Sequence, residues 1–79
     1  MSIQILFFGA TADITGFRRQ EVDVADGTAA AAVFDSVLNE HPRLAAQKLH
    51  FSVNQQFATG NELLEDGDEL AIFTPVSGG

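Results

Sequence analysis

Residues 28–42, TAAAAVFDSVLNEHP, predict the main helix of this chain. Thr28 is placed to cap the free N–H groups of the first turn, and good helix formers follow over residues 29–39. Pro42 ends the helix, because the residue before a proline is pushed away from helical angles. Five apolar residues recur at helical spacing and form one stripe, namely Ala30, Val33, Phe34, Val37 and Leu38. The stripe indicates that the helix covers an apolar surface.

Strand patterns precede this helix. Residues 3–8 are an apolar, β-branched and aromatic run that ends before Gly9, and they predict a first strand. Residues 10–16 are expected to form a loop. Residues 17–24 alternate between polar and apolar side chains and predict a second strand. Because the connection is short, the two strands are expected to pair as an antiparallel hairpin.

More strand patterns follow the helix. Residues 43–48 fit either a short helical turn or a loop. Residues 49–53 alternate cleanly, so that three side chains face the helix and two face away: Leu49, Phe51 and Val53 against His50 and Ser52. A turn at Asn54-Gln55 leads into a short strand over residues 56–58, and a tight turn over residues 65–68 precedes the last strand, residues 69–73. One helix with four or five strands predicts a two-layer α+β domain with the helix on one face of the sheet.

Length and composition restrict the function. The 79 residues make one domain, in which four basic and eleven acidic residues give a net charge of −7. This charge favours a basic protein partner and argues against nucleic acid and membrane surfaces, which need clustered Lys and Arg. Cysteine is absent, which excludes disulfides, zinc–thiolate sites and a thiol nucleophile on this chain. Without a long apolar run or a signal-peptide pattern, the protein is expected to be cytoplasmic.

The first and last strands carry more apolar residues than one buried face needs. A sheet with a helix on one face should be polar on the other, yet Leu6, Phe8, Ala71 and Phe73 fall on the uncovered face. Phe57 on the short strand adds another aromatic ring. If the first and last strands are neighbours, these residues form an exposed apolar patch, which is typical of a partner site. Alternatively, these strands are buried on both faces or a loop covers them; the short chain favours an interface.

The C-terminal tail, residues 74–79, closes with Gly78-Gly79. A frayed end and a cloning remnant are the plain interpretations. Against them, Pro75 stiffens the exit from the last strand, and the extended tail can reach about 20 Å into a pocket of another protein. Glycines, which lack a Cβ, can thread a narrow channel. A terminal carboxylate that ATP activates to an acyl-adenylate would react with a sulfur nucleophile to give a thiocarboxylate, which needs no cysteine on this chain.

Four segments together resemble the small subunit of molybdopterin synthase. They are residues 5–10 (ILFFGA), 53–55 (VNQ), 66–73 (DGDELAIF) and 75–79 (PVSGG), and the resemblance extends over nearly the whole chain. The last two are the most specific. Because that family is similar to ubiquitin in fold, the resemblance implies a β-grasp domain over residues 1–73, with a mixed four- to five-stranded sheet and one main helix on one face. An extended Gly-Gly tail would follow over residues 74–79.

The resemblance implies that the chain carries sulfur. A ubiquitin-E1-like enzyme would use ATP to adenylate Gly79, and a sulfurtransferase would supply the sulfur of the thiocarboxylate. The tail, with clearance from Gly78, would enter the large subunit, which forms the dithiolene of molybdopterin and holds the active-site side chains. This chain would be the sulfur-donating, non-catalytic subunit and would bind no cofactor stably. By position, the contact surface for partners maps onto Phe8, Phe57 and Phe73, and the predicted contact also includes Leu6, Pro75 and Val76.

The sequence departs from that family at two places and leaves other functions open. Ala12-Asp13 stands where members often have an Arg-Glu pair in the first loop, which puts any contact of that Arg in question, and Ser77 stands where Thr is more usual. A sulfur carrier for thiazole synthesis in thiamin biosynthesis is similar but usually shorter, with a reduced first hairpin. A ubiquitin-like modifier would join Gly79 to a lysine. A plain interaction module would have an inert tail.

The remaining signals are weak. Asp66-Gly67-Asp68 lacks the following carboxylates that a calcium-binding EF-hand loop requires, so a charged turn is expected and no metal site. His41 and His50 are interpreted as solvated or helix-end histidines, and Arg18-Arg19 as a solvated strand end. Because no phosphate-binding loop of the Walker type is present, the ATP site is expected in the activating enzyme.

Overall fold

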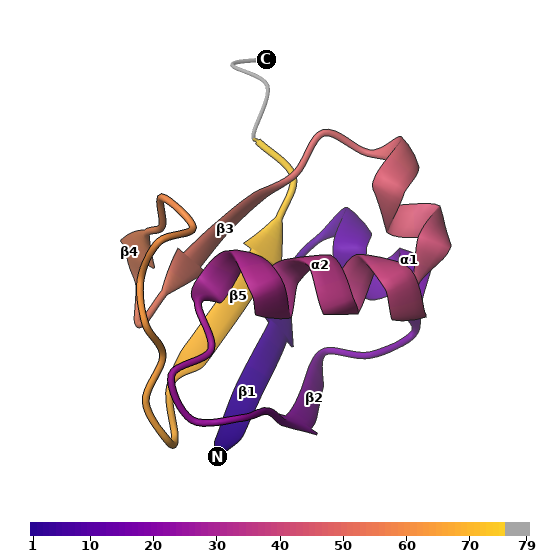
Figure 1. Ribbon diagram of the computed structural model, residues 1–79. Helices are drawn as coiled ribbons and strands as arrows, with labels where there is room; N and C mark the ends of the chain where they lie inside the picture. Colours follow the sequence, from indigo (N-terminus) through magenta and orange to yellow (C-terminus); the bar gives the residue numbers. More distant parts are fainter. Residues whose placement is uncertain (76–79) are drawn as a thin grey trace.

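The computed structural model describes residues 1–75 and contains a five-stranded sheet with one main helix across one face (Figure 1). The elements follow one another as β1 (Ser2–Phe7), α1 (Ala10–Thr15), β2 (Arg19–Asp23), α2 (Ala30–Glu40), the 3-10 helix η1 (Pro42–Ala46), β3 (His50–Val53), β4 (Gln56–Phe57) and β5 (Glu69–Phe73). The predicted two-layer α+β domain is therefore confirmed.

The sheet is mixed and has the strand order β2-β1-β5-β3-β4. β1 pairs with β2 in the expected antiparallel hairpin, and β1 pairs with β5 in parallel. β3 pairs antiparallel with both β5 and β4. Because β1 and β5 run in the same direction, both end at the side of the molecule opposite the N-terminus (Figure 1). The first and last strands are thus central neighbours, which is the condition for an apolar patch on the uncovered face.

The core lies between α2 and the two central strands. Ile3 and Ile5 of β1 and Leu70 and Ile72 of β5 have no exposed surface, and every second residue of both strands is buried. This alternation follows from the period of two of a strand, which sends successive side chains to opposite faces. The apolar stripe of α2 packs on them, with Ala30, Val33 and Val37 at most 2% exposed, and Leu44 and Leu64 complete the core.

Residues 10–15 form helix α1, whereas residues 10–16 were expected to form a loop. The helix is only six residues long, too short to show a periodic apolar pattern. Gly16 ends it with φ 80° in the left-handed region, and its N–H donates to the carbonyl of Ala12 at 2.9 Å. Thr11 is the fully buried residue of α1, so tertiary contacts rather than the sequence pattern hold this turn of helix in place.

The predicted capping role of Thr28 is wrong. Its hydroxyl donates to the carbonyl of Ala25 at 2.6 Å, and α2 begins after Ala29 without a side-chain cap. The first free N–H groups of the helix are instead paired with carbonyls of the loop between β4 and β5, Ala30 with Glu62 at 2.8 Å and Ala31 with Gly60 at 3.0 Å. A distant loop therefore replaces the local cap.

The other boundaries differ from the predictions by one or two residues. The ambiguous residues 43–48 lie mostly in η1, and the second strand is shorter at both ends than the predicted 17–24. Leu49 and Ala58 lie outside β3 and β4. Among residues 1–75, no helix has both the length and the apolar character needed to cross a membrane.

Candidate functional site

The face of the sheet away from α2, here called the open face, brings the predicted contact residues together. Leu6 of β1 pairs with Ala71 of β5, which pairs with Ser52 of β3, which in turn pairs with Phe57 of β4. Residues that are paired across strands share a face of the sheet, so these four form one row. Phe73 of β5 pairs with His50 in the adjacent row. Ser52 faces away from the helix as predicted, yet it is only 9% exposed.

An aromatic patch occupies one end of the open face; it consists of Phe8, His50, Phe57 and Phe73 with Leu6 and Ala71. The ring centroids of Phe57 and Phe73 are 5.9 Å apart in an edge arrangement, a geometry that aromatic pairs favour. Phe8 is 54% exposed and Phe57 is 78% exposed. Neither ring is covered by a loop of the described residues or buried in the sheet. The patch is therefore available to a partner at these two residues.

His50 belongs to this patch, which sequence reasoning missed. Its ring stacks on Phe73 at 6.1 Å and meets Phe57 edge-on at 6.4 Å. It is exposed, as expected of a solvated histidine, but it also extends the aromatic surface. Only the pairing of β3 with β5 places it there, and no local pattern around residue 50 encodes that pairing.

The tail leaves the body beside the aromatic patch. β5 ends at Phe73, one of the patch rings, and Pro75 follows two residues later, exposed to solvent. Any partner that covers Phe73 would therefore meet the start of the tail. Three further predicted residues, Val76, Gly78 and Gly79, lie outside the described part of the chain.

Thr11 of α1 ties the exits of the two central strands together. Its hydroxyl lies 2.7 Å from the carbonyl oxygen of Phe8 and 3.0 Å from that of Ile72, and it donates its one proton to this pair. The N–H of Phe8 also donates to the carbonyl of Ile72 at 3.1 Å. Thr11 thus positions Phe8 beside the end of β5, a role that sequence reasoning missed because residues 10–16 were expected to form a loop.

Replacing Thr11 with Val is expected to lower the free energy of unfolding by about 1 kcal/mol, because a buried hydroxyl bond is lost while the shape is kept. Urea denaturation measures this loss as a lower midpoint at constant slope. The matched control is Thr28→Val, which removes a hydroxyl bond on an exposed turn and should cost less. Equal stability of Thr11→Val and the wild type would contradict the positioning role.

Two of the segments that carry the family resemblance are joined by side-chain hydrogen bonds. Asn54, with φ 50° in the β3–β4 turn, accepts the N–H of Glu69 at 3.0 Å and donates its amide to Asp68 at 3.0 Å. Asp68 also accepts the N–H of Glu65 at 2.8 Å. The Asp66-Gly67-Asp68 segment is thus a charged turn, with Gly67 at φ 87°, that anchors the β3–β4 hairpin.

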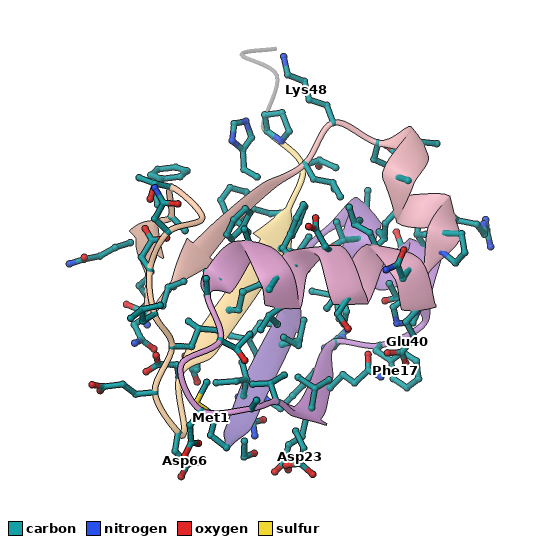
Figure 2. All side chains as sticks on the ribbon, in the orientation of Figure 1. Met1, Phe17, Asp23, Glu40, Lys48 and Asp66 are labelled. Carbon is teal, nitrogen blue, oxygen red and sulfur yellow. The ribbon has the colours of Figure 1, made fainter. Side chains whose placement is uncertain are left out.

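Charge is distributed unevenly over the open face. Next to the aromatic patch, Gln4 of β1 stands between Glu21 of β2 and Glu69 of β5. Farther along, Asp23 and Asp66 lie at the end of the molecule that holds Met1, whereas Lys48 lies at the opposite end (Figure 2). The open face therefore changes from aromatic at the tail end to acidic at the other end.

The loop before β5 is held by one carboxylate. The backbone N–H of Thr59 donates to Glu62 at 2.7 Å and holds the pKa of that carboxyl below its ordinary value. The N–H of Gly60 donates to the same carboxylate at 2.8 Å and acts in the same direction. These bonds fix the loop whose carbonyls also cap α2.

His41 is not solvated, although it is a helix-end histidine as predicted. It ends α2, its side chain is 14% exposed, and its ring packs edge-on against Phe7 at 5.8 Å. Its Nε2 lies 3.2 Å from the amide oxygen of Gln20. Within residues 1–75, no three His, Asp or Glu side chains are grouped so that they could hold a metal ion.

These features define a ubiquitin-like β-grasp protein. The crystal structure of SAMP1 from Haloferax volcanii matches it with a TM-score of 0.87 at 29% identity over 100% of both chains. Caldiarchaeum subterraneum ubiquitin matches with a TM-score of 0.70 at 22% identity, covering 100% of this chain and 98% of that one. The expected fold is therefore confirmed.

The chain belongs to the ThiS family, whose model matches residues 5–79. It is 34% identical over 82 residues to the molybdopterin synthase sulfur carrier subunit of Mycobacterium tuberculosis, covering 100% of this chain and 99% of that protein. It is also 33% identical over 82 residues to small archaeal modifier protein 1 of Haloferax volcanii, covering 91% and 94%. A complex of subunits 1 and 2 of the molybdopterin-converting factor from Helicobacter pylori contains a chain with this fold, at TM-score 0.72, 23% identity and full coverage of both chains.

Proposed function

We propose that this chain is the sulfur carrier subunit of a molybdopterin synthase, and that Gly79 carries the sulfur as a thiocarboxylate. The observation that carries the proposal is that the family match runs through residue 79, so the Gly-Gly end belongs to the shared sequence. Relatives with full-length coverage bear the name of this function. The chain donates sulfur, and the catalytic side chains belong to the large subunit.

The chemistry proceeds through an activated carboxylate. A carboxylate oxygen of Gly79 attacks the α-phosphorus of ATP, and pyrophosphate leaves, which gives an acyl-adenylate. A hydrosulfide ion, the sulfur that the sulfurtransferase supplies, then attacks the carbonyl carbon; AMP leaves with the bonding electrons, and Gly79 is left as the thiocarboxylate. We assign ATP binding to a separate E1-like enzyme. Glycine suits both attacks because it has no Cβ to crowd the reacting carbon.

The geometry of the body supports this role through the aromatic patch. Burying exposed apolar surface stabilises a complex, and the patch includes Phe73 at the end of β5, from which the tail departs. A large subunit that covers the patch would receive the tail at a fixed starting point. The docking surface and the reactive end thus work as one unit, in which the body sets the distance that the tail has to span.

A second function is favoured by one specific observation. The small archaeal modifier protein 1 of Haloferax volcanii is 33% identical to this chain, so a protein modifier is the alternative. Both functions need the same adenylated glycine, and they differ in the group that attacks it. A lysine amine gives an isopeptide bond, whereas a sulfide gives a thiocarboxylate that can be passed on. A sulfur carrier for thiazole synthesis would yield the same thiocarboxylate and differ in the pathway that it supplies.

The test is intact-mass spectrometry of the chain after incubation with ATP, the E1-like enzyme and a sulfide donor. We expect the mass to rise by the difference between sulfur and oxygen. The loaded protein is then mixed with the large subunit and the cyclic pyranopterin precursor, and the dithiolene product is measured. Two results would contradict the proposal. A chain that is loaded but forms no dithiolene, and that rescues a thiazole-forming extract, would be a sulfur carrier for thiazole synthesis. A chain that is loaded but forms no dithiolene, and that gives isopeptide adducts in the cell, would be a protein modifier.

A further inference from the structure

A groove lies between α1 and β2 at the border of the open face. It has a volume of about 640 Å³, and it is lined by the end of β1, by Gly9, by Ala12 and Asp13 of α1, and by Arg18 and Arg19. Leu6 and Phe8 of the aromatic patch also line it. The Arg18-Arg19 pair, interpreted from sequence as a solvated strand end, thus forms one wall of a hollow that continues directly into the patch.

Strand pairing places Arg19 on the open face. Arg19 stands opposite Leu6 in the β1–β2 register, in the same row as Ala71. The next residue of β2 on that face is Glu21, which stands opposite Gln4. A partner that lies on the aromatic patch would therefore meet a cation at the β2 edge before it meets the acidic end of the face.

The charge of the groove is opposite to that of the chain. The net charge is −7 and there are only four basic residues, yet two of them line this one hollow. Within the described part of the chain, no carboxylate lies within ion-pair distance of Arg18 or Arg19. Asp13 lines the same groove and reduces its positive charge without pairing with either arginine. Two guanidinium groups are thus left with donors for an outside acceptor.

We propose that the groove receives a carboxylate side chain of the large subunit when that subunit covers the aromatic patch. This inference rests on the proposed function and names a contact within it. An arginine presents its N–H donors as a planar fork that matches a carboxylate, and the apolar wall of Leu6 and Phe8 suits the aliphatic stem of Glu. The large subunit is the chosen occupant because a chain with this fold forms a complex with subunit 2 in Helicobacter pylori.

The contact also orients the partner. A partner with an acidic side chain at the groove and basic side chains opposite Glu21 and Glu69 fits the open face in one orientation only. In the reverse orientation its acidic side chain would face these glutamates and its basic side chains would face the arginines, so that like charges meet. The aromatic patch alone, being apolar, would not distinguish these orientations. The groove therefore contributes specificity, and its charges are expected to act on association at low salt.

The experiment measures affinity for the large subunit by calorimetry at low and at high salt. Arg19→Glu is expected to weaken binding about tenfold at low salt, with a smaller loss at high salt because ions screen the contact. The matched control is Arg43→Glu, which makes the same charge change on η1, outside the groove. Asp13→Asn should strengthen binding a few-fold, since it removes a competing carboxylate.

Each outcome distinguishes the groove from the proposed function. Equal affinities for Arg19→Glu and Arg43→Glu would overturn the groove contact while leaving the sulfur carrier intact. Tighter binding by Arg19→Glu would overturn it too and indicate a basic residue opposite. If Arg19→Glu reduced the sulfur loading of Gly79 but left the affinity for the large subunit unchanged, the groove would be a contact of the activating enzyme, which would also overturn the proposal. A wild-type chain that loads sulfur but does not bind the large subunit would overturn the proposed function itself.

Discussion

Deletion of Gly79 is expected to abolish sulfur loading completely while leaving the free energy of unfolding unchanged. Without this residue the terminal carboxylate moves to Gly78, one residue closer to the body. At that position the carboxylate would no longer reach the ATP that is bound by the activating enzyme. The core lies within residues 3–72, so the fold does not depend on the last residue. Extending the chain by one residue beyond Gly79 should have the same effect.

Intact mass after incubation with ATP, the activating enzyme and sulfide measures the loading, and urea denaturation measures the stability. The matched control is Ser77→Thr, a change in the same tail to the residue that is more usual in the resembling family, and it should load normally. A protein without Gly79 that still gains sulfur and supports dithiolene formation would show that another group is the carrier.

Replacement of Phe73 with Asp is expected to weaken the complex with the large subunit by about 3 kcal/mol, or roughly a hundredfold in affinity. Phe73 stacks with His50, meets Phe57 edge-on and lies at the end of the strand that leads into the tail. A carboxylate there removes apolar contact and would have to be desolvated when the partner covers the open face. Calorimetry with the large subunit measures the loss.

Two further variants make this result interpretable. Phe57→Asp changes a ring that is 78% exposed, so it should weaken the complex with no loss of stability. Phe17→Asp is the matched control, because Phe17 is exposed but packs on His41, the residue that caps the end of α2. Should Phe73→Asp and Phe57→Asp both bind like Phe17→Asp, the aromatic patch would not be the docking surface.

Local patterns predicted most of the elements. The helix over residues 30–40 and the strands around it follow from apolar periods that neighbouring residues encode. Helix α1 was not predicted, because six residues are too few to show a helical period. The cap of α2 was misassigned because the residues that pair with its first N–H groups, Gly60 and Glu62, lie about thirty residues away in the chain. In each case the missed feature depends on a contact between segments that are distant in the chain.

The open face was only partly foreseeable. The excess of apolar residues at Leu6, Phe8 and Phe73 is visible in the alternation alone and indicated a second apolar surface. The membership of His50 depends on which residue of β3 stands opposite Phe73, and that register is fixed by pairing between strands about twenty residues apart. Sequence patterns report the face of a side chain but not its neighbour on the adjacent strand.

The sequence by itself determined the layers, the two-sided apolar character of the central strands and the Gly-Gly end, because each is encoded by adjacent residues. The tertiary structure decided that β1 and β5 are parallel neighbours, which places Phe8 beside the end of β5. It also decided the anchoring role of Thr11 and the placement of Arg18 and Arg19 beside the aromatic patch. The physical reason is that hydrogen bonds between strands connect residues more than sixty positions apart, a relation that no local period records.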